Sequence, residues 1–226
     1  MISKIPVNPT NFRRQLVMCN RARDGFSAYL KYINISDDES VLLPAYIGWS
    51  AREGSGVFDP VKKRGAKYSF YEMDEFLNID LDSLQSSFEK RKVKLFVIIH
   101  YFGFVDPRYA EAIEMARSFG VKVLEDEAHS FYTNFVGGVT GVMGDASIFS
   151  LHKMFPIEYG GMLSITDSEG EIAAEEVDVV FPVVYDFPKI ARKRVENSLL
   201  ISELLEEHSD KITIMKPFLK VGEVPQ

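Results

Sequence analysis

The sequence predicts an α/β protein with a parallel sheet, and two observations support this. Short apolar runs rich in Val, Ile, Leu and Phe alternate with longer stretches that have the apolar period of an amphipathic helix. This alternation is typical of parallel strands joined by crossover helices. The chain has 226 residues, and 46% of them are hydrophobic, which suffices to bury a core. This length lies between that of one large domain and that of two small ones. We therefore expect one main domain with an appendage.

Six apolar runs are predicted to be strands, and four stretches are predicted to be helices. In chain order the strands are Val41–Ala45, Lys67–Tyr71, Lys94–Tyr101, Lys122–Glu125, Ala146–Leu151 and Gly161–Thr166. The helices are Arg23–Ile33, Leu81–Arg91, Pro107–Phe119 and a long charged helix over Pro188–His208. Asp80 and Asp106 are predicted to cap the second and third helices, and Gly120 is predicted to end the third.

Composition and charge restrict the partners and the compartment that we expect. The net charge is −7 and the pI is near 5.2, so neither nucleic acid nor an anionic membrane is an expected partner. The single cysteine, Cys19, cannot form an internal disulfide, and Met1–Arg14 lacks the apolar stretch of a signal peptide. The longest apolar run, Leu95–Val105, is far shorter than the roughly 20 residues of a membrane span. These features predict a cytoplasmic protein.

Two charged residues follow predicted strands, at the edge where open α/β folds bind ligands. Asp126 ends the run VKVLED, although an acidic residue at a strand end equally often caps a turn. Lys153 stands between a buried-looking strand and a Gly-Gly pair, an unusual place for a side chain that normally stays in water. A partly desolvated lysine can lose its proton near neutral pH, which imine formation with an aldehyde cofactor requires.

Several spaced motifs occur together between residues 100 and 163. In order they are His100-Tyr101-x-Gly103 with Asp106, Glu125-Asp126-x-Ala128-His129, Gly141 and Gly144, Ile148-Phe149-Ser150, Lys153, and Gly160-Gly161. With Val41–Tyr46 and Asn20–Phe26 upstream, this pattern resembles the DegT/DnrJ/StrS-type family of sugar aminotransferases, which depend on pyridoxal 5'-phosphate (PLP). The resemblance covers roughly residues 20 to 166. It implies the fold of aspartate aminotransferase, a three-layer αβα domain with a mostly parallel mixed sheet.

The resemblance also implies roles for individual residues around PLP. Lys153 would hold the cofactor as a Schiff base and move the proton during transamination. Asp126 would pair with the pyridine nitrogen, and His129 would lie beside the ring near the phenolic oxygen. Trp49 is the expected stacking residue, although Gly48 occupies the aligned position and core packing would explain Trp49 equally well.

Further residues would hold the phosphate of PLP. Ser150 would hydrogen-bond it, and the amides of Ala22, Arg23 and Asp24 would meet it at a helix N-terminus. Lys153 follows Ser150 by three positions, where the family usually has five. His152 is therefore expected to share the phosphate contact with Ser150.

The family pattern also implies how the chain is organised. We expect residues 1–185 to form the PLP-binding large domain, and residues 186–226 to form an interdomain helix and the remnant of a small domain. Family members continue for well over a hundred residues beyond this point, so most of the small domain is expected to be missing. A homodimer is expected, because the family builds each site across the subunit boundary.

The expected function is amino transfer from glutamate to a nucleotide-linked keto-sugar. Two alternatives remain: a PLP-binding but inactive scaffold or regulatory subunit, and the sugar dehydration that relatives with histidine at the lysine position perform. A metal site of His100, Asp126 and His129 is a weaker alternative, since their spacing does not require one, and we expect no metal. The least specific interpretation is an α/β domain whose polar groups are structural, which the ordered motifs disfavour.

Overall fold

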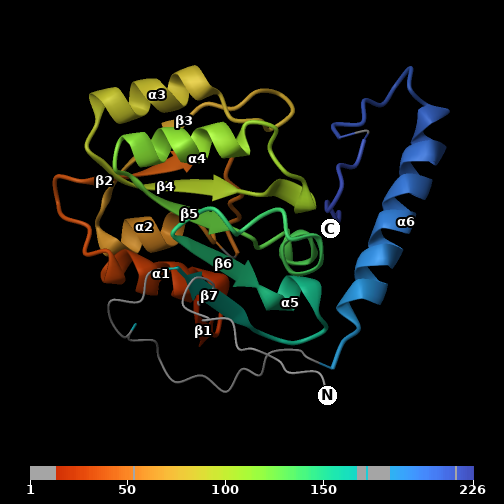
Figure 1. The fold of residues 1–226 in the computed structure, drawn as a ribbon, viewed down its shortest axis with the longest axis horizontal. Helices are drawn as coiled ribbons and strands as arrows, with labels where there is room; N and C mark the ends of the chain where they lie inside the picture. Colours follow the sequence, from red (N-terminus) through yellow and green to blue (C-terminus); the bar gives the residue numbers. More distant parts are fainter. Residues whose placement is uncertain (1–13, 53, 167–171, 173–183, 217) are drawn as a thin grey trace, which may run out of the picture.

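The protein forms a seven-stranded sheet between two layers of helices (Figure 1). A computed structural model describes residues 14–52, 54–166, 172, 184–216 and 218–226. The strand order is β1-β7-β6-β5-β4-β2-β3, and all neighbours from β6 to β3 are parallel. Only the pairs β1–β7 and β7–β6 are antiparallel. The strands are β1 (Gln15–Cys19), β2 (Ser40–Pro44), β3 (Lys67–Tyr71), β4 (Val93–Ile99), β5 (Lys122–Asp126), β6 (Ala146–Ser150) and β7 (Gly161–Ile165).

Helices cover both faces of the sheet, which confirms the three-layer αβα fold with a mostly parallel mixed sheet. The helices are α1 (Ala22–Tyr32), α2 (Phe58–Arg64), α3 (Leu81–Lys90), α4 (Tyr109–Ser118), α5 (Leu151–Met154) and α6 (Phe187–Glu206). Figure 1 shows α3 and α4 on one face and α1 and α2 on the other. Apolar side chains alternate along the strands, so each face has its own buried core. Leu124 of β5 belongs to the α1 side and Val123 to the α4 side.

Most predicted elements are present, with some differences at their ends. Asp80 caps α3, because its carboxylate accepts a hydrogen bond from Ser83 N at 2.8 Å. Gly120 follows the last turn of α4 with a φ of +68°, as predicted for a helix stop. The prediction that Asp106 caps α4 is wrong. Its carboxylate accepts from Arg108 N and Ile79 N instead, and α4 begins only at Tyr109.

Besides α5, whose first residue Leu151 was predicted to end a strand, one strand and one α-helix were not predicted from the sequence. One is β1, which pairs with β7 as the last strand of the sheet and keeps Leu16 58% exposed; its apolar run, Leu16–Cys19, is only four residues long. The other is α2, whose seven residues include Pro60 and are too few to show a helical period.

Several chain segments meet at one edge of the sheet because of this topology. The parallel strands β4, β5 and β6 end there: His100 N donates to Asp126 O, and Glu127 N donates to Ile148 O. The antiparallel β7 begins at the same edge, since Gly161 pairs with Ser150. β1 ends there as well and leads directly into the N-terminus of α1. Residues from distant parts of the sequence can therefore form one site.

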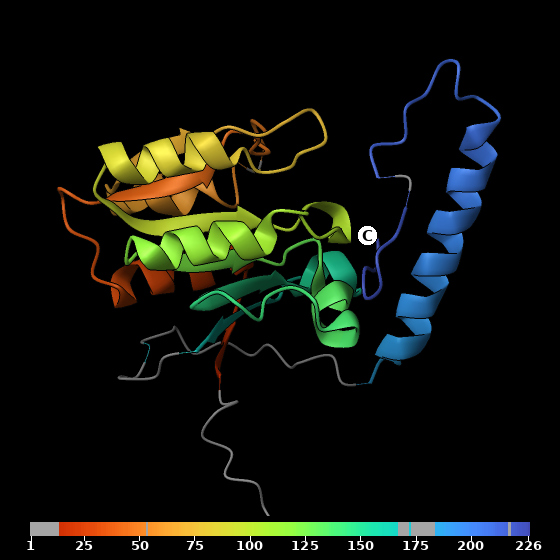
Figure 2. The ribbon, with the colours of Figure 1, turned by 45° about the horizontal axis from the view of Figure 1, so that its top comes forward.

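Helix α6 and the segment after it lie beside this edge (Figures 1 and 2). Ala191 of α6 is buried against an aromatic cluster that includes Phe131, Phe149 and Phe155. Beyond α6 the chain returns to the sheet edge, where Val224 belongs to the same cluster. Among the described residues, no helix combines the length and the apolar character that crossing a membrane requires.

Candidate functional site

Lys153 and His129 are in direct contact at the sheet edge. Lys153 lies in the short helix α5 after β6, and its Nζ is 3.1 Å from His129 Nε2. Burial, reinforced by the positive charge of Lys153, lowers the pKa of His129 to about 4. The ring is therefore neutral near pH 7, and Nε2 accepts the hydrogen bond from the Lys153 ammonium. The ring proton is then assigned to Nδ1, which is buried and finds no hydrogen-bond partner in the part of the chain that the structure describes.

Asp126 is a buried carboxyl group on which the charge of Lys153 acts. It is 4% exposed, and Oδ1 accepts a hydrogen bond from Ala128 N at 2.8 Å. Burial raises the pKa of Asp126, and the Ala128 amide and the Lys153 charge oppose part of this rise. The structure therefore brings Asp126, His129 and Lys153 together where β5 and β6 end.

An aromatic ring covers His129. Phe102 stacks on the imidazole with a centroid distance of 5.6 Å and an interplanar angle of 14°. The motif His100-Tyr101-x-Gly103 includes this position, but sequence reasoning gave Phe102 no role. Trp49, the residue predicted to stack on the cofactor, is 69% exposed and is not brought to Lys153 or His129.

The N-terminus of α1 lies against the start of β7. A Cβ on Gly161 would stand 2.2 Å from Arg21 C and 2.4 Å from Ala22 N, so only glycine fits here. Ser150 and Cys19 both pair with Gly161, which places Ser150 next to this helix end. Asp24 stabilises the first turn of α1 through two hydrogen bonds with Arg21. Its carboxylate accepts from Arg21 N at 2.9 Å, and its backbone amide donates to Arg21 O at 3.0 Å.

His152 lies near the same place. Its Nδ1 is 3.3 Å from Ser150 Oγ and 3.4 Å from Gly160 O. The predicted phosphate residues Ser150 and His152 are thus neighbours at the edge that also carries the amides of Ala22 and Arg23. Their contact with a phosphate stays a prediction.

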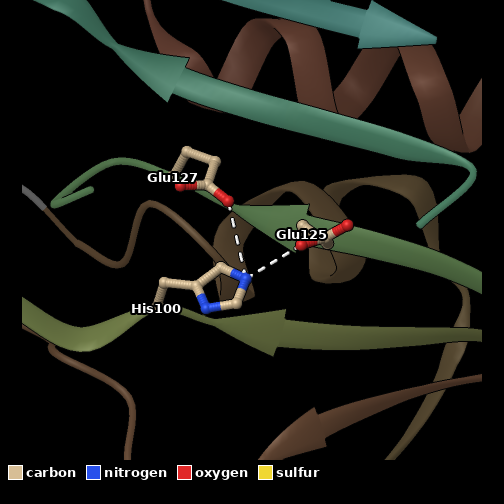
Figure 3. Close-up of side chains that lie close together, drawn as sticks. All are labelled: His100, Glu125 and Glu127. Carbon is tan, nitrogen blue, oxygen red and sulfur yellow. Dashed lines mark hydrogen bonds and ion pairs between the residues drawn. The ribbon is translucent and has the colours of Figure 1, made fainter. Parts of the chain in front are cut away.

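A second polar cluster, formed by His100, Glu125 and Glu127, is fully buried (Figure 3). His100 Nε2 lies 2.9 Å from Glu125 Oε2 and 3.5 Å from Glu127 Oε1. Burial alone would lower the pKa of His100, but the charges of Glu127 and Glu125 raise it. Burial raises the pKa of Glu127 to about 7. One or more protons are therefore shared within this cluster near neutral pH.

Glu125 is already saturated with hydrogen bonds. Its oxygens also accept from Tyr109 Oη and from three backbone amides, those of Gly141, Met143 and Gly144. Glu127 Oε2 accepts from two hydroxyl groups, while Oε1 has no hydrogen-bond partner. Glu125 thus fixes the glycine-containing loop before β6.

The weaker metal alternative, a site of His100, Asp126 and His129, is not supported. Among the described residues, the group whose ligating atoms lie within 4.8 Å of one another is His100, Glu125 and Glu127. Asp126 and His129 face Lys153 instead. The saturated oxygens of Glu125 also make this group a network of hydrogen bonds and ion pairs.

The residues at the sheet edge fit PLP. They combine an amine, a buried carboxyl group within its electrostatic reach, and a buried imidazole nitrogen, His129 Nδ1, that has no hydrogen-bond partner among the described residues. The α1 N-terminus beside Ser150 offers amides and a hydroxyl to a phosphate. Unpaired buried polar groups are rare in folded proteins, and a ligand is one explanation for them.

Comparisons with known proteins show which family and which fold the chain resembles. The family described as "DegT/DnrJ/EryC1/StrS aminotransferase family" matches residues 13–179. An uncharacterised protein of Methanocaldococcus jannaschii is 30% identical over 160 residues, 70% of this chain and 39% of that protein. The spore coat polysaccharide biosynthesis protein SpsC of Bacillus subtilis is 36% identical over 108 residues, 46% of this chain and 27% of that protein.

A solved structure shares the fold. The DegT DnrJ EryC1 StrS aminotransferase from Brucella abortus superimposes with a TM-score of 0.69 at 19% identity, covering 93% of this chain and 63% of that chain. The chain thus spans less than two thirds of the proteins to which it is similar.

Proposed function

Because the chain belongs to the DegT/DnrJ/EryC1/StrS aminotransferase family, we propose that it transfers an amino group from glutamate to a nucleotide-linked keto-sugar. The observation that carries the proposal is the contact of Lys153 Nζ with neutral His129 beside buried Asp126. The sugar substrate is supported by a similar protein, the UDP-4-amino-4,6-dideoxy-N-acetyl-beta-L-altrosamine transaminase of Campylobacter jejuni, which is 25% identical over 130 residues.

Pyridoxal phosphate is the cofactor of this family. When bound, it supplies an electron sink for the carbanion that forms at the substrate carbon. Lys153 Nζ would hold it covalently, and Asp126 would hold the proton of its pyridine nitrogen. Ser150, with His152 beside it, and the amides of Ala22 and Arg23 would bind the phosphate. Asp24 would contribute through the first turn of α1, which it fixes.

Lys153 would also move the proton that transamination requires. Once its amine is released, Nζ can take a proton from the substrate carbon and return it to the cofactor side. His129 would support this step, because its neutral Nε2 can accept a hydrogen bond from the free amine and keep Nζ in place without adding a positive charge. Asp126 would keep its negative charge beside a protonated pyridine nitrogen, since burial makes an unpaired carboxylate unfavourable.

The organisation of the molecule remains part of the proposal. Residues 1–185 would bind the cofactor, and residues 186–226 would form the interdomain helix and the remnant of a small domain. A homodimer in the cytoplasm would be the working form. The exposed Trp49 would then stack on a cofactor ring only after a rearrangement of its loop or in the neighbouring subunit's site.

A second candidate is a PLP-binding protein without turnover, a scaffold or regulatory subunit. Cofactor binding without either half-reaction is what would distinguish this candidate from the aminotransferase. Sugar dehydration is less favoured, because the described site presents a lysine, Lys153, to His129.

The test begins with the bond to the cofactor. The protein is mixed with PLP, its absorption spectrum is recorded, and the complex is reduced with borohydride and mapped by mass spectrometry. The adduct is expected on Lys153. Lys153→Arg should abolish it, whereas Lys122→Arg, a change at the opposite end of the sheet where Lys122 pairs with Asp145, should not. An adduct elsewhere, or none, would overturn the proposal.

Turnover is measured next. Glutamate alone should convert the bound cofactor to its amine form, and a panel of nucleotide-linked keto-sugars should convert it back. Cofactor binding with neither half-reaction, over several donors and acceptors, would favour the protein without turnover.

A further inference from the structure

Phe102 stacks on His129 from a backbone conformation that non-glycine residues rarely adopt. Its φ is +57°, and that of the following Gly103 is +86°. Such backbone conformations persist only where the surrounding structure holds them. The turn Tyr101–Gly103 therefore needs contacts that stabilise it.

Those contacts come from the segment that returns to the sheet after α6. We call Lys220–Gln226 the returning segment. Gln226 N donates to Phe102 O at 2.9 Å, and Glu223 Oε1 accepts from Val105 N at 2.8 Å. A Cβ on Gly103 would stand 2.2 Å from Val224 O, so this turn and the segment are in tight contact.

Thr133 connects the turn with the returning segment. Its side chain is fully buried, and its Oγ1 lies 2.7 Å from Gly103 O, to which it donates. The same oxygen accepts from Val224 N at 3.0 Å. One hydroxyl group thus bridges the turn that carries Phe102 and the segment that covers it. Figures 1 and 2 both show the end of this segment next to the turn after β4.

We propose that Thr133 and the returning segment position Phe102 on His129 and thereby hold the imidazole against Lys153. Thr133 acts through Gly103 and Val224, so it is a positioning residue. The significance for catalysis rests on the proposed function. The positioning itself does not, because the contacts exist within the protein alone.

The experiment compares Thr133→Val with two matched variants. Valine keeps the shape of threonine but removes the hydroxyl group, while Thr133→Ser retains it. Thr140→Val removes another fully buried hydroxyl, one that donates to Glu127 Oε2 instead of to Gly103. All three are studied as the full chain without PLP. The His129 ring signal is identified among the four histidines by its loss in His129→Gln.

The first measurement is the NMR titration of the His129 ring. Its pKa is held near 4 by burial and by Lys153, so a ring that Phe102 no longer covers should titrate about one unit higher. The second is hydrogen exchange at the amide of Val105, which Glu223 protects. Exchange there should accelerate at least about tenfold. Both changes are expected in Thr133→Val and absent in Thr133→Ser and Thr140→Val.

Two results would overturn the proposal. One is an unchanged His129 pKa and unchanged Val105 exchange in Thr133→Val. The other is an equal change in Thr140→Val, which would indicate general loosening. If Thr133→Val does not fold, Glu223→Gln is measured in its place. In that variant, hydrogen exchange at the Val105 amide must accelerate while the fold is retained. Borohydride trapping on Lys153 is recorded separately, so failure to bind PLP would count against the proposed function and not against the positioning.

Discussion

Asp126 is the residue whose charge matters most to the proposed chemistry. Asp126→Asn keeps the shape but removes the negative charge that would hold the pyridine proton. Amino transfer should fall by at least about 100-fold, in the range typical of losing a proton-holding group. Steady-state turnover measures this, with Asp145→Asn as the control because that carboxylate pairs with Lys122 away from the site. Full activity in Asp126→Asn would contradict the role assigned here.

Glu127 should make stability depend on pH. Burial raises its pKa to about 7, so the folded state holds a proton that the unfolded state releases above its ordinary pKa of 4.5. The folded state therefore binds more protons in this window, and stability falls as the pH rises. The slope for one group is at most about 1.4 kcal/mol per pH unit.

Urea unfolding at about pH 5 and about pH 6.5 checks this slope. Glu127→Gln should flatten it, while the exposed Glu75→Gln should leave it as in the wild type. Equal slopes in the wild type and Glu127→Gln would show that Glu127 does not hold the proton.

Single residues also mark the limit of sequence reasoning. Asp126 and Lys153 were recognisable because a carboxylate and a lysine follow apolar strands. The burial of Glu127 could not be recognised from the sequence, since the side chain of an acidic residue after a strand is normally exposed to water. Phe102 was missed as well, because its role depends on a backbone conformation that the sequence does not reveal.

At the scale of elements, the junction of β7 and α1 should determine how tightly the phosphate of PLP is bound. Gly161→Ala places a methyl group 2.2 Å from Arg21 C and must displace the start of α1. The affinity for PLP should fall at least about tenfold, a loss of about 1.4 kcal/mol. Fluorescence titration with PLP measures it. Gly56→Ala is the control, since nothing lies within 4 Å of its Cβ, and equal affinities of the two variants would exclude this role.

The elements themselves could largely be predicted. The strands β2 to β7 and the helices α1, α3, α4 and α6 match expected segments, because each is long enough to show its period or is continuously apolar. β1 and α2 are short and half exposed, and their existence depends on partners elsewhere in the chain. β1 nevertheless leads directly into α1 and so determines where the predicted phosphate-binding amides lie.

At the scale of the whole molecule, α6 presents an apolar surface to solvent. Leu199, Leu200, Ile201 and Leu204 are each more than half exposed, which is unusual for a helix of a monomer. We expect a homodimer in sedimentation velocity experiments. Leu200→Asp should increase the monomer fraction if α6 takes part in the contact, and Lys193→Asp, on the same helix, serves as a polar control. A monomer in the wild type at all concentrations would contradict the expected dimer.

The antiparallel pairing of β1 with β7 has a consequence for synthesis of the protein. Gln15 pairs with Ile165 and Cys19 with Gly161, so β1 leaves the ribosome long before its partner strand exists. Helix α1 can form early from local contacts, but its starting point is fixed against Gly161 only when nearly all of the sheet has been made. A nascent chain should therefore complete the junction of α1 and β7 last, after β2 to β6 have already assembled.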